Sequence, residues 1–294
     1  MTSSSTVHNM AKEGFGTGTN ELYDRARPSY QSGALAHIKQ AVQSKSPLNI
    51  VEYAHIPVYW DSQFDHLRID LVPGLGSSPV PFSLTQNGPN LSTNSKRLSQ
   101  VRVCEVYSPK PSRTSGVSTA EGTFDNTSVE DGWADLVVVA QAFHWCPDYG
   151  KAATEFSRIL KPNGIVALIW NLEDRERAAW VAQLRDVYEQ HENGTPQFRL
   201  NLWRATFSTD SYKELFVPPE ETVWEYTLEG TRDIVVDRVC SKSYIAVLPP
   251  DAKEKVKKEV GAIVDRGDGL KWIDAEKGIF EYPYKTFVVV WKKK

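Results

Sequence analysis

A histidine and a carboxylate stand at the ends of apolar runs, where their side chains could take part in chemistry. His144 follows the continuous run Asp135–Val139. Glu52 ends another short run, which begins at Leu48. In open α/β folds, ligands bind at the carboxyl ends of the strands. An imidazole there can accept a proton or hydrogen-bond a carboxylate or hydroxyl of a bound acceptor.

The elements that must position these side chains form a strand–helix–strand unit. Asp135–Val139 is rich in β-branched residues, which is typical of a strand buried on both faces of a parallel sheet. Apolar residues from Ala153 to Leu160 recur with helical spacing, and the turn residues Lys161–Gly164 should end that helix. Ile165–Trp170 is a second apolar strand. This order predicts a protein of the α/β class.

Other apolar patterns predict elements outside that unit. Further helices and a last strand are expected at Leu35–Val42, Trp180–Tyr188, Val256–Val264 and Phe287–Trp291. Asp251 and Glu254 have capping-box spacing and are predicted to open the third of these helices.

The stretch from Tyr53 to Thr119 has a different character. Ser and Pro dominate it, and prolines from Pro73 to Pro111 argue against long helices and central strands. Only Gln100–Val106 has strand-like apolar spacing. Irregular stretches of this length are uncommon in compact domains.

Composition excludes several classes of protein. Hydrophobic content of 40% excludes wholesale disorder, and a net charge of −3 provides no broad basic field for nucleic acid. Cys104, Cys146 and Cys240 show no paired spacing, which argues against a disulfide framework or a zinc or other metal site. No apolar run has the length of a signal peptide core or a membrane span, so a cytoplasmic protein without a membrane partner is expected. The sequence carries no pattern that indicates an oligomeric state.

Five segments, taken in order, resemble the class I S-adenosylmethionine-dependent methyltransferases of type 11. Gln141–Trp145 is similar to the His-Trp segment of the trans-aconitate-methyltransferase-like, fungal-type branch. Leu160–Gly164 is similar to the family's Leu-Lys-Pro-Gly-Gly turn, and Glu121–Phe124 to its adenine-contacting segment. Tyr23–Tyr30 resembles an N-terminal segment that lies over the cofactor, and Ser241–Tyr244 a segment of the cap.

The resemblance covers residues 14–52 and about 119–294. It implies a Rossmann-like fold, with a mostly parallel sheet, helices on both faces and a C-terminal helical and hairpin elaboration. It also implies S-adenosyl-L-methionine as cofactor and a small-molecule methyl acceptor, a carboxylate or a hydroxyl. The expected parts are a flexible N-terminus at 1–20, a methyltransferase-like core at 21–170 interrupted by the irregular segment 53–119, and cap elements plus closing strands at 171–294.

The same resemblance assigns roles to individual residues. Methyl transfer is an in-line displacement that needs alignment of the reactants, and a base only if the acceptor must lose a proton. His144 is the candidate catalytic residue. The residues implied in cofactor binding are Tyr23, Arg27, Glu52, Glu105, Thr123, Phe124 and Gln141.

Four of these candidates have a specific expected contact. The Arg27 guanidinium suits the methionyl carboxylate of the cofactor. Thr123 and Phe124 would flank the adenine, and Glu105 would hold the ribose hydroxyls, although it lies further along the chain than the roughly 20 residues usual for such sites. Alternative interpretations stay open: His144 can be a structural histidine, and Arg27 a surface arginine pre-ordered by Pro28.

One feature departs from the family. A glycine-rich loop should follow the first strand and admit the cofactor, but Tyr53–Pro57 contains no glycine. Gly14–Gly18 lacks a preceding strand, and Gly74–Gly76 is followed by Pro79 and a further proline, so neither run replaces the loop. We therefore interpret the segment from Tyr53 to about Thr119 as foreign to the family, for example through a mis-joined exon or a retained intron.

Two other functions share this sheet topology. A catalytically impaired, methyltransferase-like binding or regulatory protein would explain the missing glycines. A nicotinamide-dependent dehydrogenase also has a doubly wound sheet, but it too requires a glycine fingerprint and lacks the Leu-Lys-Pro and His-Trp features.

Overall fold

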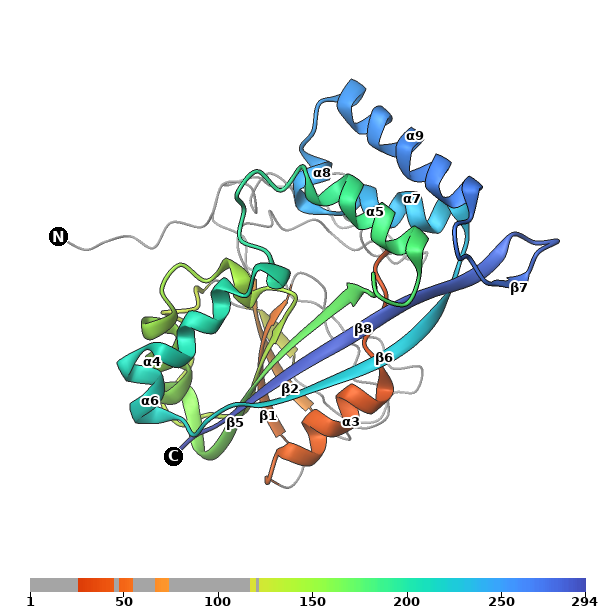
Figure 1. Ribbon diagram of the computed structural model, residues 1–294. Helices are drawn as coiled ribbons and strands as arrows, with labels where there is room; N and C mark the ends of the chain where they lie inside the picture. The colour runs from red at the N-terminus through yellow and green to blue at the C-terminus, as the bar shows by residue number, and fades with distance from the viewer. Residues whose placement is uncertain (1–25, 45–47, 55–66, 74–116, 120–121) are drawn as a thin grey trace, which may run out of the picture.

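The computed structural model describes residues 26–44, 48–54, 67–73, 117–119 and 122–294 (Figure 1). The strands are β1 (Leu48–Ala54), β2 (Leu67–Pro73), β3 (Val117–Thr119), β4 (Ala134–Ala140), β5 (Leu160–Glu173), β6 (Glu220–Gly230), β7 (Trp272–Asp274) and β8 (Ile279–Lys292). The α-helices are α3 (Ser32–Ala41), α4 (Tyr149–Ile159), α5 (Ala179–Glu189), α6 (Asp210–Leu215), α7 (Arg232–Cys240), α8 (Ser243–Ala246) and α9 (Pro250–Arg266). Short 3-10 helices are η1 (Phe143–Trp145), η2 (Phe198–Leu200) and η3 (Leu202–Ser208).

The described strands form one sheet in the order β3-β2-β1-β4-β5-β8-β6, and β7 pairs with β8. Strands β1 to β5 pair in parallel, whereas β8 runs antiparallel to both of its long neighbours. Ile50 of β1 lies opposite Leu136 of β4, so the two halves of the chain that flank the Ser/Pro-rich segment share one sheet. The predicted α/β, mostly parallel architecture is confirmed.

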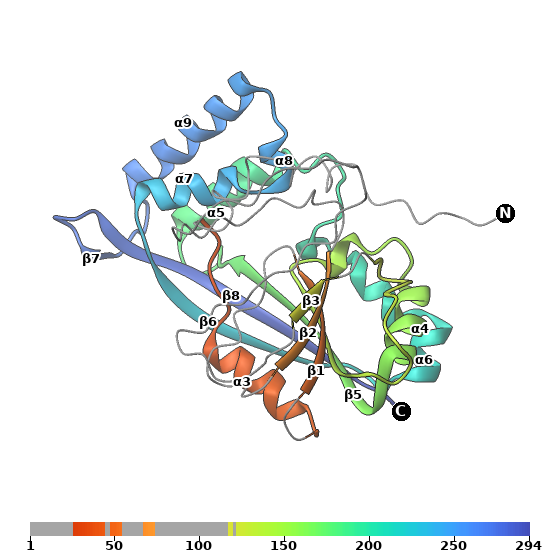
Figure 2. The ribbon, with the colours of Figure 1, turned by 180° about the vertical axis from the view of Figure 1, so that it is seen from behind.

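Helices cover both faces of this sheet, with α3 on one side and α4 and α6 on the other (Figure 2). All seven residues of β4 are buried, as its β-branched run predicted. Leu136 and Val138 pack with Ile38 of α3, whereas Val137 and Val139 pack with Phe156 of α4. The strand therefore contributes alternate side chains to two separate cores.

Helix α4 begins and ends close to the prediction. The Asp148 side chain caps it by accepting a hydrogen bond from the Lys151 amide at 3.0 Å. The predicted turn after it, Lys161–Gly164, lies within β5 and interrupts the pairing with β4 instead of separating the helix from the strand. Gly164 fits this interruption because a Cβ there would lie 3.0 Å from the backbone oxygen of Ala134.

The Ser/Pro-rich stretch contributes to the sheet, contrary to expectation. β2 pairs in parallel with β1 in the interior of the sheet, so the prediction of no central strand in this stretch was wrong. Pro73 is the last residue of β2, where proline interrupts the ladder least. Gln100–Val106 lies outside the described residues. β1 also continues to Ala54, so Glu52 lies within the strand and not at its end.

A helical cap stands over the carboxyl end of the sheet, formed by α5, α7, α8 and α9 together with the far halves of β5, β6 and β8 (Figure 1). Apolar residues hold it together, among them Trp180, Tyr188, Val239, Ile245, Val260 and Tyr282. α9 starts at Pro250 and Pro249 caps it without a side-chain hydrogen bond, so the predicted capping box at Asp251 was wrong. No helix in the described ranges is long and apolar enough to cross a membrane.

Candidate functional site

The carboxyl end of β4 lies at a topological switch point of the sheet. From β1 the chain builds outward to β2 and β3, then returns to place β4 on the other side of β1. Gln141, the first residue after β4, has a positive φ of 54°. Its amide donates to the Ile169 carbonyl at 2.9 Å and its side chain to the Asn171 carbonyl at 3.1 Å. These bonds hold a backbone conformation that is unfavourable for a non-glycine residue, at the place where open α/β folds bind ligands.

His144 lies in η1, directly beyond Gln141, and is mostly buried. The indole Nε1–H of Trp170, in β5, donates to His144 Nδ1 at 3.2 Å. Because an indole nitrogen only donates, Nδ1 must be the unprotonated nitrogen and Nε2 carries the proton of the neutral ring. His144 is therefore arranged to donate a hydrogen bond from Nε2, and taking a proton at Nδ1 would break the Trp170 bond.

Arg27 joins two segments on which the family resemblance rests. Its Nη2 donates to the Ser241 carbonyl at 2.9 Å and its Nε to Ser241 Oγ at 3.3 Å. The Asn171 amide donates to the Pro28 and Ser29 carbonyls at 3.2 Å each. The N-terminal segment is thereby fixed across the end of β5 and against the cap. Much of the Arg27 guanidinium is engaged by Ser241, although the residue still borders the cavity described next.

An open cavity lies between the sheet edge and the cap. Its empty space, counted out into the open solvent, is about 630 Å³. Its walls come from η1, the end of β5, α5, η2, α7 and α8. They comprise Arg27, Gln141, His144, Trp145, Asn171, Leu172, Tyr188, Glu189, Glu192, Gln197, Phe198, Arg199, Arg238, Lys242, Ser243 and Tyr244.

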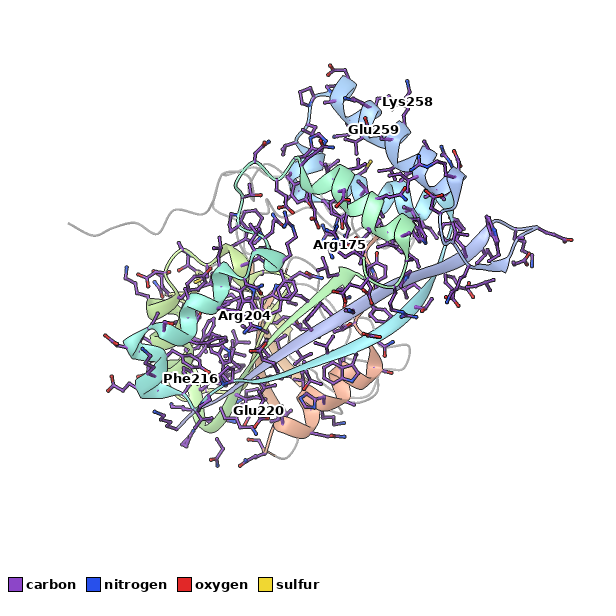
Figure 3. All side chains as sticks on the ribbon, in the orientation of Figure 1. Arg175, Arg204, Phe216, Glu220, Lys258 and Glu259 are labelled. Atoms are coloured by element: carbon purple, nitrogen blue, oxygen red, sulfur yellow. The ribbon has the colours of Figure 1, made fainter. Side chains whose placement is uncertain are left out.

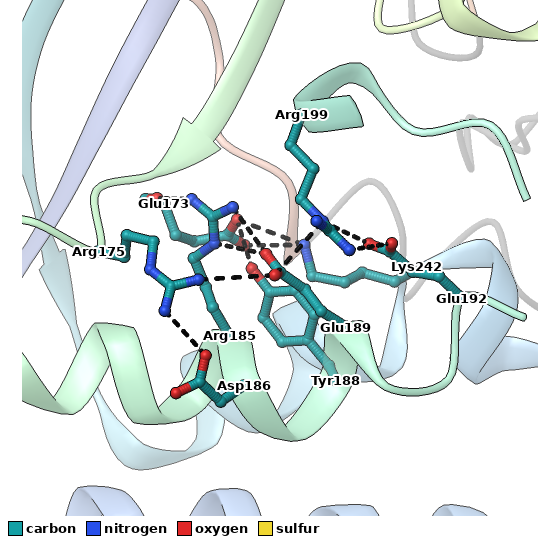
Figure 4. Close-up of polar contacts among 9 residues, drawn as sticks. All are labelled: Glu173, Arg175, Arg185, Asp186, Tyr188, Glu189, Glu192, Arg199 and Lys242. Carbon is teal, nitrogen blue, oxygen red and sulfur yellow. Dashed lines mark hydrogen bonds and ion pairs between the residues drawn. The ribbon is translucent and has the colours of Figure 1, made fainter. Parts of the chain in front are cut away.

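A buried carboxylate, Glu173 of β5, lies behind this cavity (Figure 4). Its oxygens are 3.1 Å from Lys242 Nζ and 3.2 Å from Arg238 Nε, and they accept a hydrogen bond from the Tyr188 hydroxyl at 3.0 Å. Burial alone would raise the pKa of Glu173, but Arg238 and Lys242 hold it well below its usual range. Glu173 is therefore a buried anion that ties the cap to the sheet.

Lys242 is the cation of this group whose charge can change near neutral pH. Burial lowers the pKa of its ammonium to about 7; Glu173 opposes that change, while Arg238 and Arg27 add to it. The ammonium also lies 4.1 Å from the centre of the Tyr188 ring. Lys242 is thus poised to gain or lose a proton as its surroundings change.

A second set of ion pairs lines the mouth of the cavity (Figure 4). Glu189 pairs with Arg185 at 2.6 Å and with Arg199 at 3.3 Å. Arg199 also pairs with Glu192. Burial raises the pKa of Glu192, with Arg199 acting against that shift. These pairs fix the rim formed by α5 and η2.

The predicted adenine-contacting residues lie elsewhere along the sheet edge. The Phe124 ring is stacked on Tyr53 with centroids 5.2 Å apart, and it also meets the edge of Phe143. Both stacked rings are almost fully buried. The Thr123 hydroxyl donates to Asp125 at 2.7 Å. In this arrangement one face of the Phe124 ring is occupied by Tyr53.

Three predicted cofactor-binding residues remain, and the structure describes one of them. Glu52 is fully buried within β1. Tyr23 and Glu105 lie outside the described residues, as do the residues that follow β1 and the glycine runs at 14–18 and 74–76. Of the predicted residues that the structure describes, His144, Gln141 and Arg27 line one cavity, whereas Glu52, Thr123 and Phe124 are not among its lining residues.

Four residues of the site were not identified from the sequence. Asn171 and Glu173 follow the predicted strand Ile165–Trp170, so their position at a strand end was a usable signal. Lys242 stood within the Ser241–Tyr244 segment that resembles the family. Arg238 carried no signal, because it lies in a helix whose apolar pattern is weak.

The cofactor implied by the family resemblance can be compared with these residues. The aminoacyl end of S-adenosylmethionine carries a carboxylate and two positive charges. The amides of Gln141 and Asn171, the carboxylates of the rim and the guanidinium of Arg238 can hold such groups, so the cavity fits that end. Phe124, the ring expected beside the adenine, is buried and stacked on Tyr53.

Comparisons with known proteins point to one family. Residues 74–168 match the model of the methyltransferase domain family. An uncharacterized methyltransferase of Mycobacterium bovis is 31% identical over 169 residues, 57% of this chain and 62% of that protein. An uncharacterized methyltransferase of Schizosaccharomyces pombe is 32% identical over 139 residues, 46% of this chain and 51% of that protein. The chain thus spans between about half and two thirds of the length of these relatives.

The fold is also found among solved structures. A proposed type II methyltransferase from Anaeromyxobacter dehalogenans superposes with a TM-score of 0.51 at 13% identity, over 90% of this chain and 97% of that one. The family match begins at residue 74, so residues 74–119 of the Ser/Pro-rich segment also resemble the family. The chain is thus similar in sequence to methyltransferases, and its fold is similar to that of a proposed methyltransferase.

Proposed function

We propose that the protein transfers a methyl group from S-adenosyl-L-methionine to a small-molecule acceptor that carries a carboxylate or a hydroxyl. The observation that carries this proposal is the open cavity at the carboxyl end of β4 and β5. Gln141, His144 and Asn171 line it at the edge of a doubly wound sheet, next to the switch point. The match to the methyltransferase domain family supports methyl transfer as the reaction at that edge.

The protein's part in such a reaction is to bind, orient and exclude water. S-adenosylmethionine, when bound, supplies an already activated methyl group. The amides of Gln141 and Asn171 would hold its aminoacyl end, and Arg27 would close the site from the N-terminal side. The rings of Trp145 and Phe198 would keep water from the reacting atoms.

The hydrogen bonding of His144 favours a carboxylate over a hydroxyl as the acceptor. A carboxylate is already ionised at neutral pH and needs no base, whereas a hydroxyl must lose a proton. The Trp170 indole donates to His144 Nδ1, so that nitrogen is not placed to take a proton from a hydroxyl acceptor. We propose that His144, which lines the cavity, orients the acceptor and does not act as a base.

Several expectations remain proposals for the cofactor's adenosyl end. Glu105 would hold the ribose hydroxyls and Tyr23 would cover the cofactor. Glu52 would bind the cofactor from its position within β1. Thr123 and Phe124 would flank the adenine, although the Phe124 ring is stacked on Tyr53. Membership in the trans-aconitate-methyltransferase-like, fungal-type branch is likewise part of the proposal.

Calorimetric titration of the full chain with S-adenosylmethionine and S-adenosylhomocysteine tests the proposal. We expect saturable binding of both, weakened in Gln141→Ala because an amide of the cavity wall is lost. Gln183→Ala is the matched control, since that amide bonds Asp268 on the surface of α5. Absence of binding at millimolar cofactor would overturn the proposal and leave a methyltransferase-like binding or regulatory protein.

A further inference from the structure

A buried guanidinium nitrogen at the cavity wall lacks a hydrogen-bond partner. Arg238 is 2% exposed, and its Nε lies 3.2 Å from both the Tyr284 hydroxyl and Glu173. Its Nη1 is buried and makes no hydrogen bond in the described part of the protein. Buried donors are nearly always paired, and Arg238 lines the cavity, so a ligand bound there can supply the acceptor.

The charges around this nitrogen do not balance. Among the described residues, ion pairs join four buried or half-buried cations to three carboxylates here, so this cluster carries one more positive than negative charge when Lys242 is protonated. Buried charges are normally paired, because an isolated one is costly in a low-dielectric interior. The cations are Arg185, Arg199, Arg238 and Lys242, and the carboxylates are Glu173, Glu189 and Glu192.

We propose that Arg238 and Lys242 form a carboxylate-binding subsite in the wall of this cavity, where a ligand carboxylate accepts a hydrogen bond from Arg238 Nη1 and supplies the missing negative charge. The carboxylate has two possible sources, the methyl acceptor and the aminoacyl end of the cofactor. The inference rests on the proposed function only in naming these two sources, since carboxylate binding itself requires no methyl transfer.

Binding at this subsite takes up a proton on Lys242. The free protein holds Lys242 partly neutral near pH 7 because it is buried. An anion placed beside it favours the charged form, so the ammonium recovers its proton from the buffer when the carboxylate binds. The groups that face Lys242 from the surrounding elements are Glu173, Arg238, Arg27, Tyr188, Glu192 and Tyr244.

The first test uses the unmodified full chain and simple probes. Acetate, hexanoate and benzoate are each titrated against the matching neutral amide at pH 8, in phosphate and in Tris. We expect at least one carboxylate to bind more than tenfold tighter than its amide, with uptake of roughly one proton at pH 8 and almost none at pH 6. Equal binding of acid and amide, no binding of any probe, or binding without proton uptake would each overturn the subsite.

Two substitutions test the charge argument in opposite directions. Arg238→Gln should weaken binding of the preferred carboxylate about tenfold or more, because a charged donor is lost. Glu173→Gln should strengthen this binding, because Arg238 and Lys242 both lose their internal partner. If the cluster had only a structural role, both substitutions would weaken carboxylate binding. Arg175→Gln is the matched control, since Arg175 bonds Asp186 in the same network but does not line the cavity (Figure 4).

Titration with S-adenosylhomocysteine separates the two sources of the carboxylate. If Arg238→Gln weakens S-adenosylhomocysteine about tenfold and leaves no separate site for the simple acids, the cofactor supplies the carboxylate. If it weakens only the simple acids, the acceptor does. If Arg238→Gln weakens the binding of neither S-adenosylhomocysteine nor the simple acids, the inference is overturned. If the protein binds carboxylates with proton uptake but does not bind the cofactor, the subsite is supported and the proposed function is overturned.

Discussion

Lys242 should make the stability of the protein depend on pH between 7 and 10. Its ammonium is buried in the cap, and burial lowers its pKa from 10.5 to about 7 in the folded state. In the unfolded chain the pKa returns to the ordinary value, so the unfolded state binds more protons between pH 7 and 10.5. Stability therefore rises with pH in this window, and the destabilisation is fully present below pH 7.

The magnitude follows from the size of the shift. The full shift corresponds to about 5 kcal/mol of destabilisation at low pH, at about 1.4 kcal/mol per pH unit. Between pH 7 and pH 9 the free energy of unfolding should rise by about 2 kcal/mol because of Lys242 alone. Lys242→Met removes the titrating group and keeps the length of the side chain, while Glu173 stays paired with Arg238 at 3.2 Å. The variant should lose this rise.

Urea unfolding followed by tryptophan fluorescence, at pH 6, 7, 8 and 9, measures the difference. The matched control is Lys258→Met, because Lys258 projects into solvent from the outer face of α9 (Figure 3). We expect the control to follow the unmodified protein at every pH. Parallel curves for the unmodified protein and Lys242→Met would refute the reasoning, since they would show that Lys242 keeps its ordinary pKa when folded.

Three further substitutions probe the sheet edge and its supports. Trp170→Phe removes the donor to His144 Nδ1, so nitrogen NMR should show the ring's proton redistributing between its two nitrogens; unchanged shifts would contradict the assigned tautomer. Gly164→Ala should lower the free energy of unfolding by about 1–3 kcal/mol, because the added Cβ would lie 3.0 Å from the Ala134 oxygen; an unchanged denaturation midpoint would be inconsistent with that crowding. Asp135→Asn should cost about 1–3 kcal/mol at neutral pH. Burial opposes the ionisation of Asp135, yet its hydrogen bonds lower the pKa, so the unmodified protein should lose this contribution as pH falls below about 4 and meet the variant there in acid unfolding curves.

Local sequence patterns were enough to predict the central unit of the sheet. The β-branched run in β4, the helical spacing in α4 and the apolar run in β5 each depend on neighbours a few residues away. His144 could be placed near the site for the same reason, because it directly follows a strand whose direction was predictable. Periodicity thus carried information wherever burial repeats along the chain.

Only the tertiary structure decided how the buried charges are arranged. β2 did carry a local signal, because apolar and polar residues alternate from Leu67 to Leu71, but the surrounding prolines outweighed it in the prediction. Glu173 and Lys242 are 69 positions apart, and neither has a neighbour in the sequence that reveals the other. Whether a charged side chain is exposed or buried beside a partner depends on which distant elements pack together, and residue type alone does not specify it. For that reason the sequence determined the sheet and the place of its ligand edge, and packing of the cap against β5 decided which charges face the ligand.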